Sequence, residues 1–229
     1  MLKHSWLLVI CALTLLSLSL ACADDSESGF VSLFNGQDLS GWEGQNDAWI
    51  VAGGAIKCTG KKDGERNWIV WRGGELADFE LRLKFRFTSG NSGVQVRSKD
   101  EGEFQVRGYQ VEIAAADKMG LWHHSLSPEP YRSHLATAGQ KGRVSADGSK
   151  THEQVAEAAE IQKSCKDGEW NDLIIIAEGS KLVQIINGVV FAELVDEDAK
   201  YAAKSGVLAF QDHGKGTTAE FKDIRLKAK

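Results

Sequence analysis

Two pairs of polar side chains stand at alternate positions in segments with strand-like composition. Gln110 and Glu112 are separated by one apolar residue, and Gln211 and His213 have the same spacing. Alternation along a strand places both members of each pair on one face. A carboxylate and an imidazole that share a groove are suited to proton transfer. We therefore predict a polar groove at these strands; the alternatives are a Glu112 that faces solvent and a His213 that only makes a structural hydrogen bond.

A third polar segment begins at Asn91 and ends at Arg97. Gly93 permits a tight entry into a strand, and the guanidinium of Arg97 offers a rigid set of donors to hydroxyl or oxyanion groups. We predict that Asn91 and Arg97 contribute to the same groove. The alternative is that Asn91 lies in a turn and Arg97 in an ordinary surface ion pair.

Residues 119–135 interrupt the strand pattern and are expected to form a binding loop over the groove. They are rich in histidine and aromatic side chains, namely Trp122, His123, His124, Tyr131 and His134. Adjacent residues of a strand point in opposite directions, so at most one of His123 and His124 is expected to enter a shared site. A divalent ion held by one of them with Glu112 is an alternative, but no cofactor or metal is predicted.

The elements that must position these groups are predicted to be antiparallel β-strands. Turn residues recur every eight to twelve positions and proline is scarce, which is typical of a β-sandwich. Asn187-Gly188 accepts positive φ at both positions of a hairpin turn. A short helix is expected within 151–161. The predicted strands are 79–87, 93–97, 109–114, 173–177, 182–186, 189–194, 206–211 and 219–227.

Five tryptophans could be mistaken for ligand platforms, but large aromatic side chains in sandwiches mostly fill the core. We expect Trp42, Trp49 and Trp170 in the core. Trp68 and Trp71 are three residues apart in an extended segment, so they are expected on opposite faces, with one exposed.

The N-terminus has the features of a secretory signal peptide. Lys3 precedes the apolar run 6–16, and Ala21-Cys22-Ala23 provides small residues for cleavage after Ala23. The run is short for a transmembrane helix. We expect a secreted or periplasmic protein with one domain over 24–229. The alternative is a lipoprotein anchored to a membrane through Cys22.

The rest of the composition excludes some partners and leaves one question open. The net charge is −5, and basic residues are interleaved with acidic ones, so no nucleic-acid partner is predicted. Cys58 and Cys165 would remain after cleavage. In an oxidising compartment they could form a disulfide, but two free thiols are the alternative.

Several motifs in this order and spacing resemble the 3-keto-disaccharide hydrolase domain family. They are the stretches 30–42, 49–51, 78–81, 91–97, 108–113, 168–171, 186–188, 208–214 and 221–224. The resemblance covers nearly all of the chain after the signal segment. It implies an all-β, concanavalin-like jelly roll and cleavage of glycosides whose sugar carries a ketone at C3.

The resemblance also assigns roles to the candidate residues. A ketone at C3 acidifies the C2 proton and permits elimination of the C1 substituent, followed by addition of water. Such a site needs a base, for which Glu112 is the candidate, and donors for the enolate and the leaving group, for which His213 and Arg97 are the candidates. Many relatives carry Glu and Gln in the reverse order at 110 and 112. The predicted contacts to the carbohydrate substrate are Asn91, Gln110, Gln211, Trp122, His123, His124 and Tyr131. A non-catalytic carbohydrate-binding module is the alternative function, because fold does not determine function.

Overall fold

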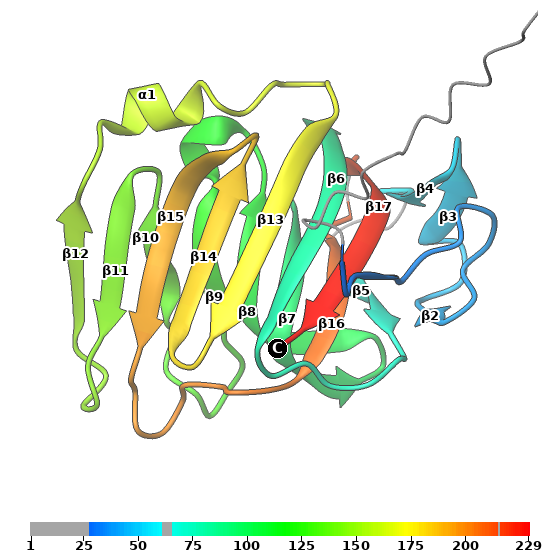
Figure 1. Cartoon of the computed structure of the whole chain (residues 1–229). Coiled ribbons are helices and arrows are strands. Elements are labelled where there is room, and N and C mark those ends of the chain that lie inside the picture. Colours follow the sequence, from blue (N-terminus) through cyan, green and yellow to red (C-terminus); the bar gives the residue numbers. More distant parts are fainter. Residues whose placement is uncertain (1–27, 61–65, 215) are drawn as a thin grey trace, which may run out of the picture.

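The computed structural model describes residues 28–60, 66–214 and 216–229. Two β-sheets are packed face to face (Figure 1). The predicted signal segment and Cys22 lie outside the described residues. Within the described residues, no helix is long and apolar enough to cross a membrane.

The larger sheet carries the two ends of the described chain, because β1 (Val31–Ser32) pairs with β17 (Thr218–Ala228). Its neighbours pair antiparallel except β11 and β15, which are parallel. In spatial order its strands are β12 (Lys150–Gln154), β11 (Gln140–Val144), β15 (Val189–Asp196), β14 (Lys181–Ile186), β13 (Asn171–Glu178), β6 (Phe79–Ser89), β17, β4 (Ala55–Cys58) and β3 (Trp49–Ala52).

The smaller sheet is antiparallel throughout. Its strands in spatial order are β10 (Ser133–Thr137), β9 (Gly120–His124), β8 (Gln105–Ile113), β7 (Ser92–Gly102), β16 (Val207–Asp212), β5 (Asn67–Trp71) and β2 (Trp42–Glu43). The helical segments of the described chain are the 3₁₀ turn Ala116–Lys118 and α1 (Ala158–Gln162). The fold is the all-β jelly-roll sandwich that the strand pattern and the resemblance predict.

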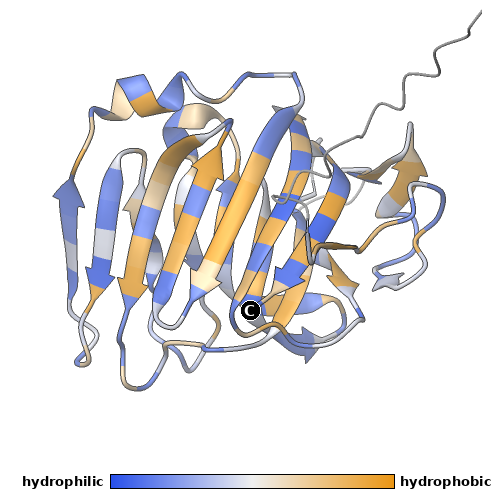
Figure 2. Cartoon of the chain, viewed as in Figure 1, coloured by the Kyte–Doolittle hydropathy of each residue, from blue (hydrophilic) through white to orange (hydrophobic). Residues whose placement is uncertain are grey.

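Alternation of apolar and charged residues explains how the sheets pack. In β6 every second side chain from Phe79 to Phe85 is buried, whereas the charged residues between them face outward. The alternating colours along β6 and β17 in Figure 2 show the same pattern. Phe210 joins the two sheets, with its ring centroid 4.8 Å from that of Trp42 and 4.1 Å from that of Phe221. The core therefore holds the smaller sheet rigidly from its inner face.

Two predicted irregular segments are strands. Residues 98–102, which lie between the predicted strands 93–97 and 109–114, belong to β7. This strand ends at a two-residue hairpin turn, Glu103-Phe104. Residues 119–135 are only partly the predicted loop: they contribute β9 and the first three residues of β10 to the smaller sheet, and 125–132 form the loop between these strands. Apolar residues that face the core on these strands, such as Leu121 and Leu135, make sheet formation favourable despite the many histidines.

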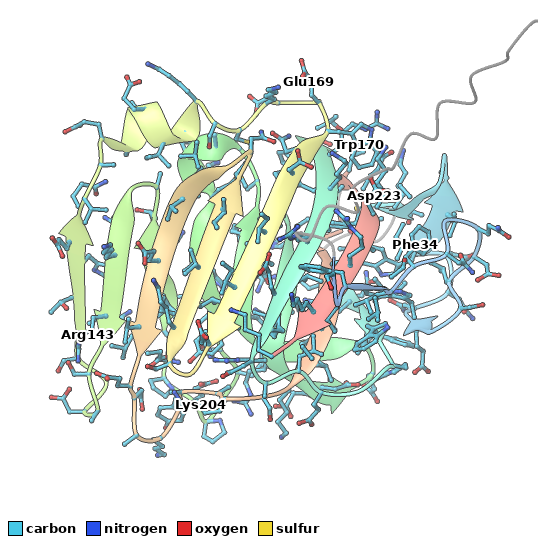
Figure 3. The ribbon with its side chains drawn as sticks, viewed as in Figure 1. Phe34, Arg143, Glu169, Trp170, Lys204 and Asp223 are labelled. Carbon is cyan, nitrogen blue, oxygen red and sulfur yellow. The ribbon has the colours of Figure 1, made fainter. Side chains whose placement is uncertain are left out.

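The predictions for the remaining elements have mixed outcomes. Segment 151–161 contains both the end of β12 and the start of α1. Trp42 and Trp49 are in the core, as predicted. Trp170 is not: it is half-buried next to the start of β13 (Figure 3), where Lys222 Nζ lies 4.1 Å from its ring centroid. The ammonium group of Lys222 over the Trp170 ring makes a cation–π contact, which stabilises the ring outside the core.

Trp68 and Trp71 lie on opposite faces of β5, as the spacing predicts. Neither is exposed, contrary to the prediction: Trp68 is buried on the outer face of the smaller sheet, and Trp71 is half-buried against the main core. Cys58 and Cys165 are both free. Burial raises the pKa of the Cys58 thiol to about 12, so it stays protonated at neutral pH.

Candidate functional site

The outer face of the smaller sheet carries a hollow of about 270 Å³. Three strands place its polar groups side by side, because Gln211 of β16 pairs with Gly93 of β7, which pairs with Glu112 of β8. We call it the Glu112 pocket. Its lining residues are Arg66, Asn91, Gln110, Glu112, Lys118, Trp122, His124, Tyr131, His134, Gln211 and His213. The structure thus brings together the two polar pairs that alternation places in one groove.

Glu112 is the buried acid of this pocket, with 7% of its surface exposed. Asn91 Nδ2 donates to its Oε1, and Gln110 Nε2 donates to its Oε2 over 2.7 Å. Burial raises the pKa of Glu112, while the hydrogen bonds from Asn91 and Gln110 act in the opposite direction. The result is a fixed carboxylate that is a stronger base than an exposed glutamate.

Gly93 is required for this arrangement. A Cβ atom at position 93 would lie 2.5 Å from Cγ of Gln110, closer than carbon atoms can approach. The missing side chain lets Gln110 lie across β7 and reach Gln211, with Nε2 donating to Oε1 over 3.1 Å. Glycine is therefore needed at position 93 because a side chain there would occupy the space of Gln110, and not because of backbone flexibility.

A row of buried side chains fixes the orientation of the Gln110 amide. Ser98 Oγ lies 2.8 Å from Gln95 Oε1, and Gln95 Nε2 donates to Gln110 Oε1 over 2.8 Å. With its oxygen engaged by Gln95, Gln110 presents its Nε2 to Glu112 and Gln211. Gln95 and Ser98 do not line the pocket, and they act on Glu112 through Gln110.

Arg66 supplies a positive charge at the other side of the pocket. Its Nε donates to His213 Nε2 over 3.1 Å, and its Nη1 lies 3.5 Å from His124 Nδ1. Burial and the charge of Arg66 lower the pKa of His213. The same causes, in that order, lower the pKa of His124 to about 4. Both imidazoles are therefore neutral at pH 7, and each faces the arginine with an acceptor nitrogen.

Asp212 holds the loop that carries His213. Its Oδ1 accepts from Gly214 N over 2.8 Å, and its Oδ2 accepts from Gly60 N over 3.2 Å. The side chain is buried, which raises its pKa despite these hydrogen bonds. Asp212 therefore positions His213 and does not itself line the pocket.

An aromatic wall closes the pocket over β9 and β10. The ring of Trp122 lies edge-on to His134 at 4.5 Å and to Tyr131 at 5.8 Å between centroids. Trp122 is half-buried, whereas Tyr131 is 70% exposed. An exposed aromatic rim beside polar groups is suited to the apolar face of a sugar ring.

Arg97 is not in this pocket, contrary to the prediction. A bulge in β7, where Arg97 has a φ of 46°, turns the side chain to the inner side of the sheet. There it donates to Ala77 O over 2.6 Å, to Gly179 O over 2.7 Å and to Asp78 Oδ1 over 2.6 Å. Arg97 joins the two sheets and cannot reach Glu112.

His123 also lies away from the pocket. The strand alternation that exposes His124 to the pocket directs His123 inward, where its ring packs edge-on to Tyr109 at 5.4 Å. Its Nδ1 is 2.9 Å from Ser125 Oγ. Burial, followed by the charges of Arg132 and Arg107, lowers the pKa of His123 to about 3.

The sequence interpretation missed two cationic residues of the pocket, Arg66 and Lys118. Arg66 directly precedes β5, and Lys118 ends the 3₁₀ turn after β8. Only their position next to strands of the predicted groove could have indicated them. Within the described part of the chain, no group of three metal-ligating His, Cys, Asp or Glu side chains is found.

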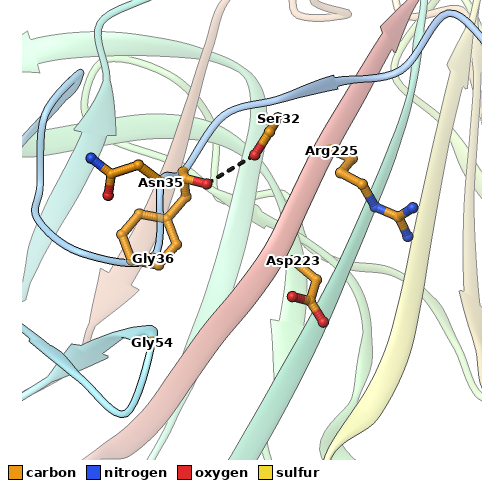
Figure 4. A pocket seen from close by; sticks show the side chains of 7 residues that line it. Ser32, Asn35, Gly36, Gly54, Asp223 and Arg225 are labelled. Carbon is orange, nitrogen blue, oxygen red and sulfur yellow. Dashed lines mark hydrogen bonds between the residues drawn. The ribbon is translucent and has the colours of Figure 1, made fainter.

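A second hollow, of about 460 Å³, lies against β17 of the larger sheet (Figure 4). It is lined by the turn at Asn35 and Gly36 and by Asp223 and Arg225 of β17. Its lining includes none of the predicted site residues. The residues suited to proton transfer are in the Glu112 pocket.

Comparison with known families identifies the family of the chain. The family model of the 3-keto-alpha-glucoside-1,2-lyase-like domain matches residues 29–227. The chain belongs to this family. The match covers both sheets, so the lyase-like domain includes every strand that borders the Glu112 pocket.

Solved structures show the same fold at low identity. A crystal structure from Parabacteroides distasonis, named "Putative glycosyl hydrolase", is 18% identical and superposes with a TM-score of 0.59 over 87% of this chain and 99% of that one. The carbohydrate-binding module CBM66 of Bacillus subtilis is 13% identical, with a TM-score of 0.52 over 82% and 96% of the two chains. A Bacillus subtilis protein with a galectin-like fold is 10% identical, with a TM-score of 0.55 over 82% and 90%. No curated protein matches the chain in sequence.

Proposed function

We propose that this lyase-like protein cleaves 3-keto-glycosides by elimination, with Glu112 as the base. The observation that carries the proposal is the buried Glu112 carboxylate, held by Asn91 and Gln110 in a pocket that also contains Arg66. The match to the 3-keto-alpha-glucoside-1,2-lyase-like family supports this choice of substrate class. A glycosidase that protonates an ordinary glycosidic bond would use two carboxyl groups that flank it. Among the residues that line this pocket, Glu112 is the carboxylic acid.

The first step removes the C2 proton of the keto sugar. The C2–H bond breaks, the proton passes to Glu112, and the electron pair forms the C2=C3 bond of an enolate. Negative charge then develops on the C3 oxygen, where a cation or an N–H donor stabilises it. Arg66 takes the role that the sequence interpretation gave to Arg97. Neutral His213 accepts from Arg66 through Nε2, so it can donate through Nδ1 as an electrophile.

The second step expels the C1 substituent. The C3 carbonyl forms again, the electron pair of C2=C3 shifts to C1=C2, and the C1–O bond breaks. The leaving oxygen takes the proton held by Glu112, which restores the carboxylate. The products are a conjugated enone and an alcohol or sugar, and addition of water to C1 and C2 of the enone gives the free 3-keto sugar. Because their pKa values are lowered, the neighbouring histidines are neutral and carry no imidazolium proton to donate. Protonated Glu112 is therefore the donor for this step.

Incubation of the purified protein with a 3-keto-disaccharide in D₂O tests the proposal. Elimination followed by hydration incorporates deuterium at C2 of the released keto sugar, whereas direct hydrolysis retains the C2 proton. The unoxidised disaccharide is the substrate control, and the keto sugar incubated without protein measures spontaneous exchange. Release without enzyme-dependent deuterium at C2, or no release, contradicts the proposed reaction.

The aromatic wall supports a second candidate function, carbohydrate binding without cleavage. Trp122 and the exposed Tyr131 form a rim of the kind that binds sugar rings. This alternative predicts that sugars bind and that nothing is released from the keto substrate. Glycan binding measured together with the release assay distinguishes the two functions.

A further inference from the structure

The Glu112 pocket continues into a wider hollow beyond Arg66. This hollow measures about 860 Å³ and shares Arg66, His124 and His213 with the pocket. We call it the Phe104 hollow. Its other lining residues are Gln45, Glu103, Phe104, Gln105 and Leu126. Arg66, His124 and His213 therefore lie between two adjacent hollows.

The turn that carries Phe104 has an unusual composition. Glu103 and Phe104 join β7 to β8 as a two-residue turn between the paired residues Gly102 and Gln105, with φ values of 49° and 57°. Positive φ at both positions favours Asn and Gly, and a bulky side chain there costs on the order of 1 kcal/mol. The same chain uses Asn187-Gly188 for the corresponding turn between β14 and β15. The β7–β8 turn retains a bulky aromatic residue where glycine would be more stable.

Hydrogen bonds fix this turn beside Arg66. Trp68 N donates to Phe104 O over 3.1 Å, and Gln105 Nε2 donates to Arg66 O over 2.7 Å. The tip of the hairpin is thereby attached to the start of β5, and Phe104 remains half-buried at the wall of the hollow. Strained residues that neighbouring contacts hold in place occur preferentially at ligand sites.

The side chains around Phe104 are those that bind neutral sugars. An aromatic ring offers a surface for the apolar face of a pyranose, and Gln45, Gln105 and Glu103 offer hydrogen-bonding groups for hydroxyls. We propose that the Phe104 hollow is the subsite for the leaving-group sugar of a disaccharide, with Phe104 as its stacking platform. This inference rests on the proposed function, in which the keto sugar occupies the Glu112 pocket and the bond to be broken lies near Arg66.

Two variants at one position separate this role from a structural one. Phe104→Gly removes the ring and suits the positive φ, so the turn itself is expected to keep its shape. Phe104→Tyr retains the ring. The assay compares kcat/KM for a 3-keto-disaccharide with kcat/KM for a methyl 3-keto-glycoside, which has no second sugar. Phe104→Gly is expected to lower the ratio of kcat/KM for the disaccharide to kcat/KM for the methyl glycoside about tenfold, mainly through a higher KM for the disaccharide. Phe104→Tyr is expected to keep the wild-type ratio.

The result that overturns the subsite is a ratio unchanged in Phe104→Gly, because a ring in contact with the leaving sugar cannot be removed without effect. An equal loss on both substrates also overturns it. The thermal midpoint of each variant identifies any loss of folding. If wild type cleaves neither substrate, the proposed function fails, and calorimetric binding of the disaccharide then decides the subsite. Weaker binding to Phe104→Gly than to wild type supports it; equal binding, or none to wild type, overturns it.

Discussion

Two adjacent histidines mark the contrast between the two sides of the smaller sheet. On the inner side, close to His123, charges are paired directly: Arg132 Nη2 donates to Asp196 Oδ2 over 2.6 Å, and Tyr109 donates to the same oxygen over 2.5 Å. On the outer side, where His124 points, the buried carboxylate of Glu112 is held by amides and not by a cation. A carboxylate paired with a cation is a weaker base, whereas a buried carboxylate held by neutral donors is a stronger one.

The comparison indicates why Arg97 and Arg66 have different roles although both are arginines near the predicted groove. Arg97 is buried with its donors directed at two carbonyl oxygens and Asp78, so it stabilises the packing of the sheets. Arg66 is exposed and faces two neutral imidazoles. Its charge remains available to a ligand.

The largest effect is expected from Glu112→Gln. The amide keeps the size of the side chain but cannot accept the C2 proton, so kcat should fall about a thousandfold. Removal of a buried charge favours the folded variant, but its new Nε2 would face a donor, Asn91 Nδ2 or Gln110 Nε2, so the free energy of unfolding should change by less than about 2 kcal/mol. Release of sugar from a 3-keto-disaccharide measures the first and urea unfolding the second. A variant with wild-type kcat would contradict the role of Glu112 as base.

On the inner side, Asp196→Ala is expected to lower stability rather than kcat. The substitution removes the nearer of the two carboxylates beside buried Arg132 and leaves only Asp198 Oδ2 at 3.8 Å, so the free energy of unfolding should fall by about 3 kcal/mol. Glu197→Ala is the matched control, because Glu197 is exposed and pairs with exposed Arg143, so its loss should change stability by less than about 1 kcal/mol. Equal stabilities of the two variants would show that the inner cluster is not structural.

A smaller effect is expected from pH. In the folded protein the pKa of His123 is about 3 and that of His124 about 4, whereas unfolded histidine titrates near 6.5. Above pH 6.5 both states are neutral and stability does not depend on these groups. Below it the unfolded state binds more protons, so stability should fall by up to about 1.4 kcal/mol per histidine per pH unit, until the folded pKa is reached.

Urea unfolding at pH 7, 6 and 5 measures this slope. His123→Gln is expected to remove the part of the slope due to His123 and leave the part due to the other histidines whose pKa is lowered, which include His124 and His213. A wild-type stability that rises on acidification over this range would contradict the burial of both rings as neutral groups.

The sequence was sufficient to predict the sandwich and much of the pocket. The alternation in 109–114 correctly placed Gln110 and Glu112 on one face, and the spacing of Gln211 and His213 brought them to the same pocket. Both predictions depend on the two-residue period of a strand, which is local. The turn at Asn187-Gly188 was predicted for the same reason.

Other features depend on distant contacts and could not be predicted in this way. The bulge that turns Arg97 inward lies where the register of β7 shifts against both β8 and β16, and these strands are distant from Arg97 in the sequence or follow it. Arg66 enters the site through the pairing of β5 with β16. The motifs around Trp170 and Asn187 match the family, but the amide of Asn187 bonds to Ser164 and Asn171 far from the pocket, so these motifs maintain the fold.

The hydrogen-bonded row that ends at Glu112 has a direction, with each amide donating to the next group from Gln95 through Gln110 to the carboxylate. A carboxylate at position 110 would still accept from Gln95, and a glutamine at 112 could donate to it while accepting from Asn91. Rotation of the Gln211 amide by half a turn would restore the remaining bond. The row therefore permits the acid and the amide to exchange places along β8 while each neighbouring pair keeps a hydrogen bond.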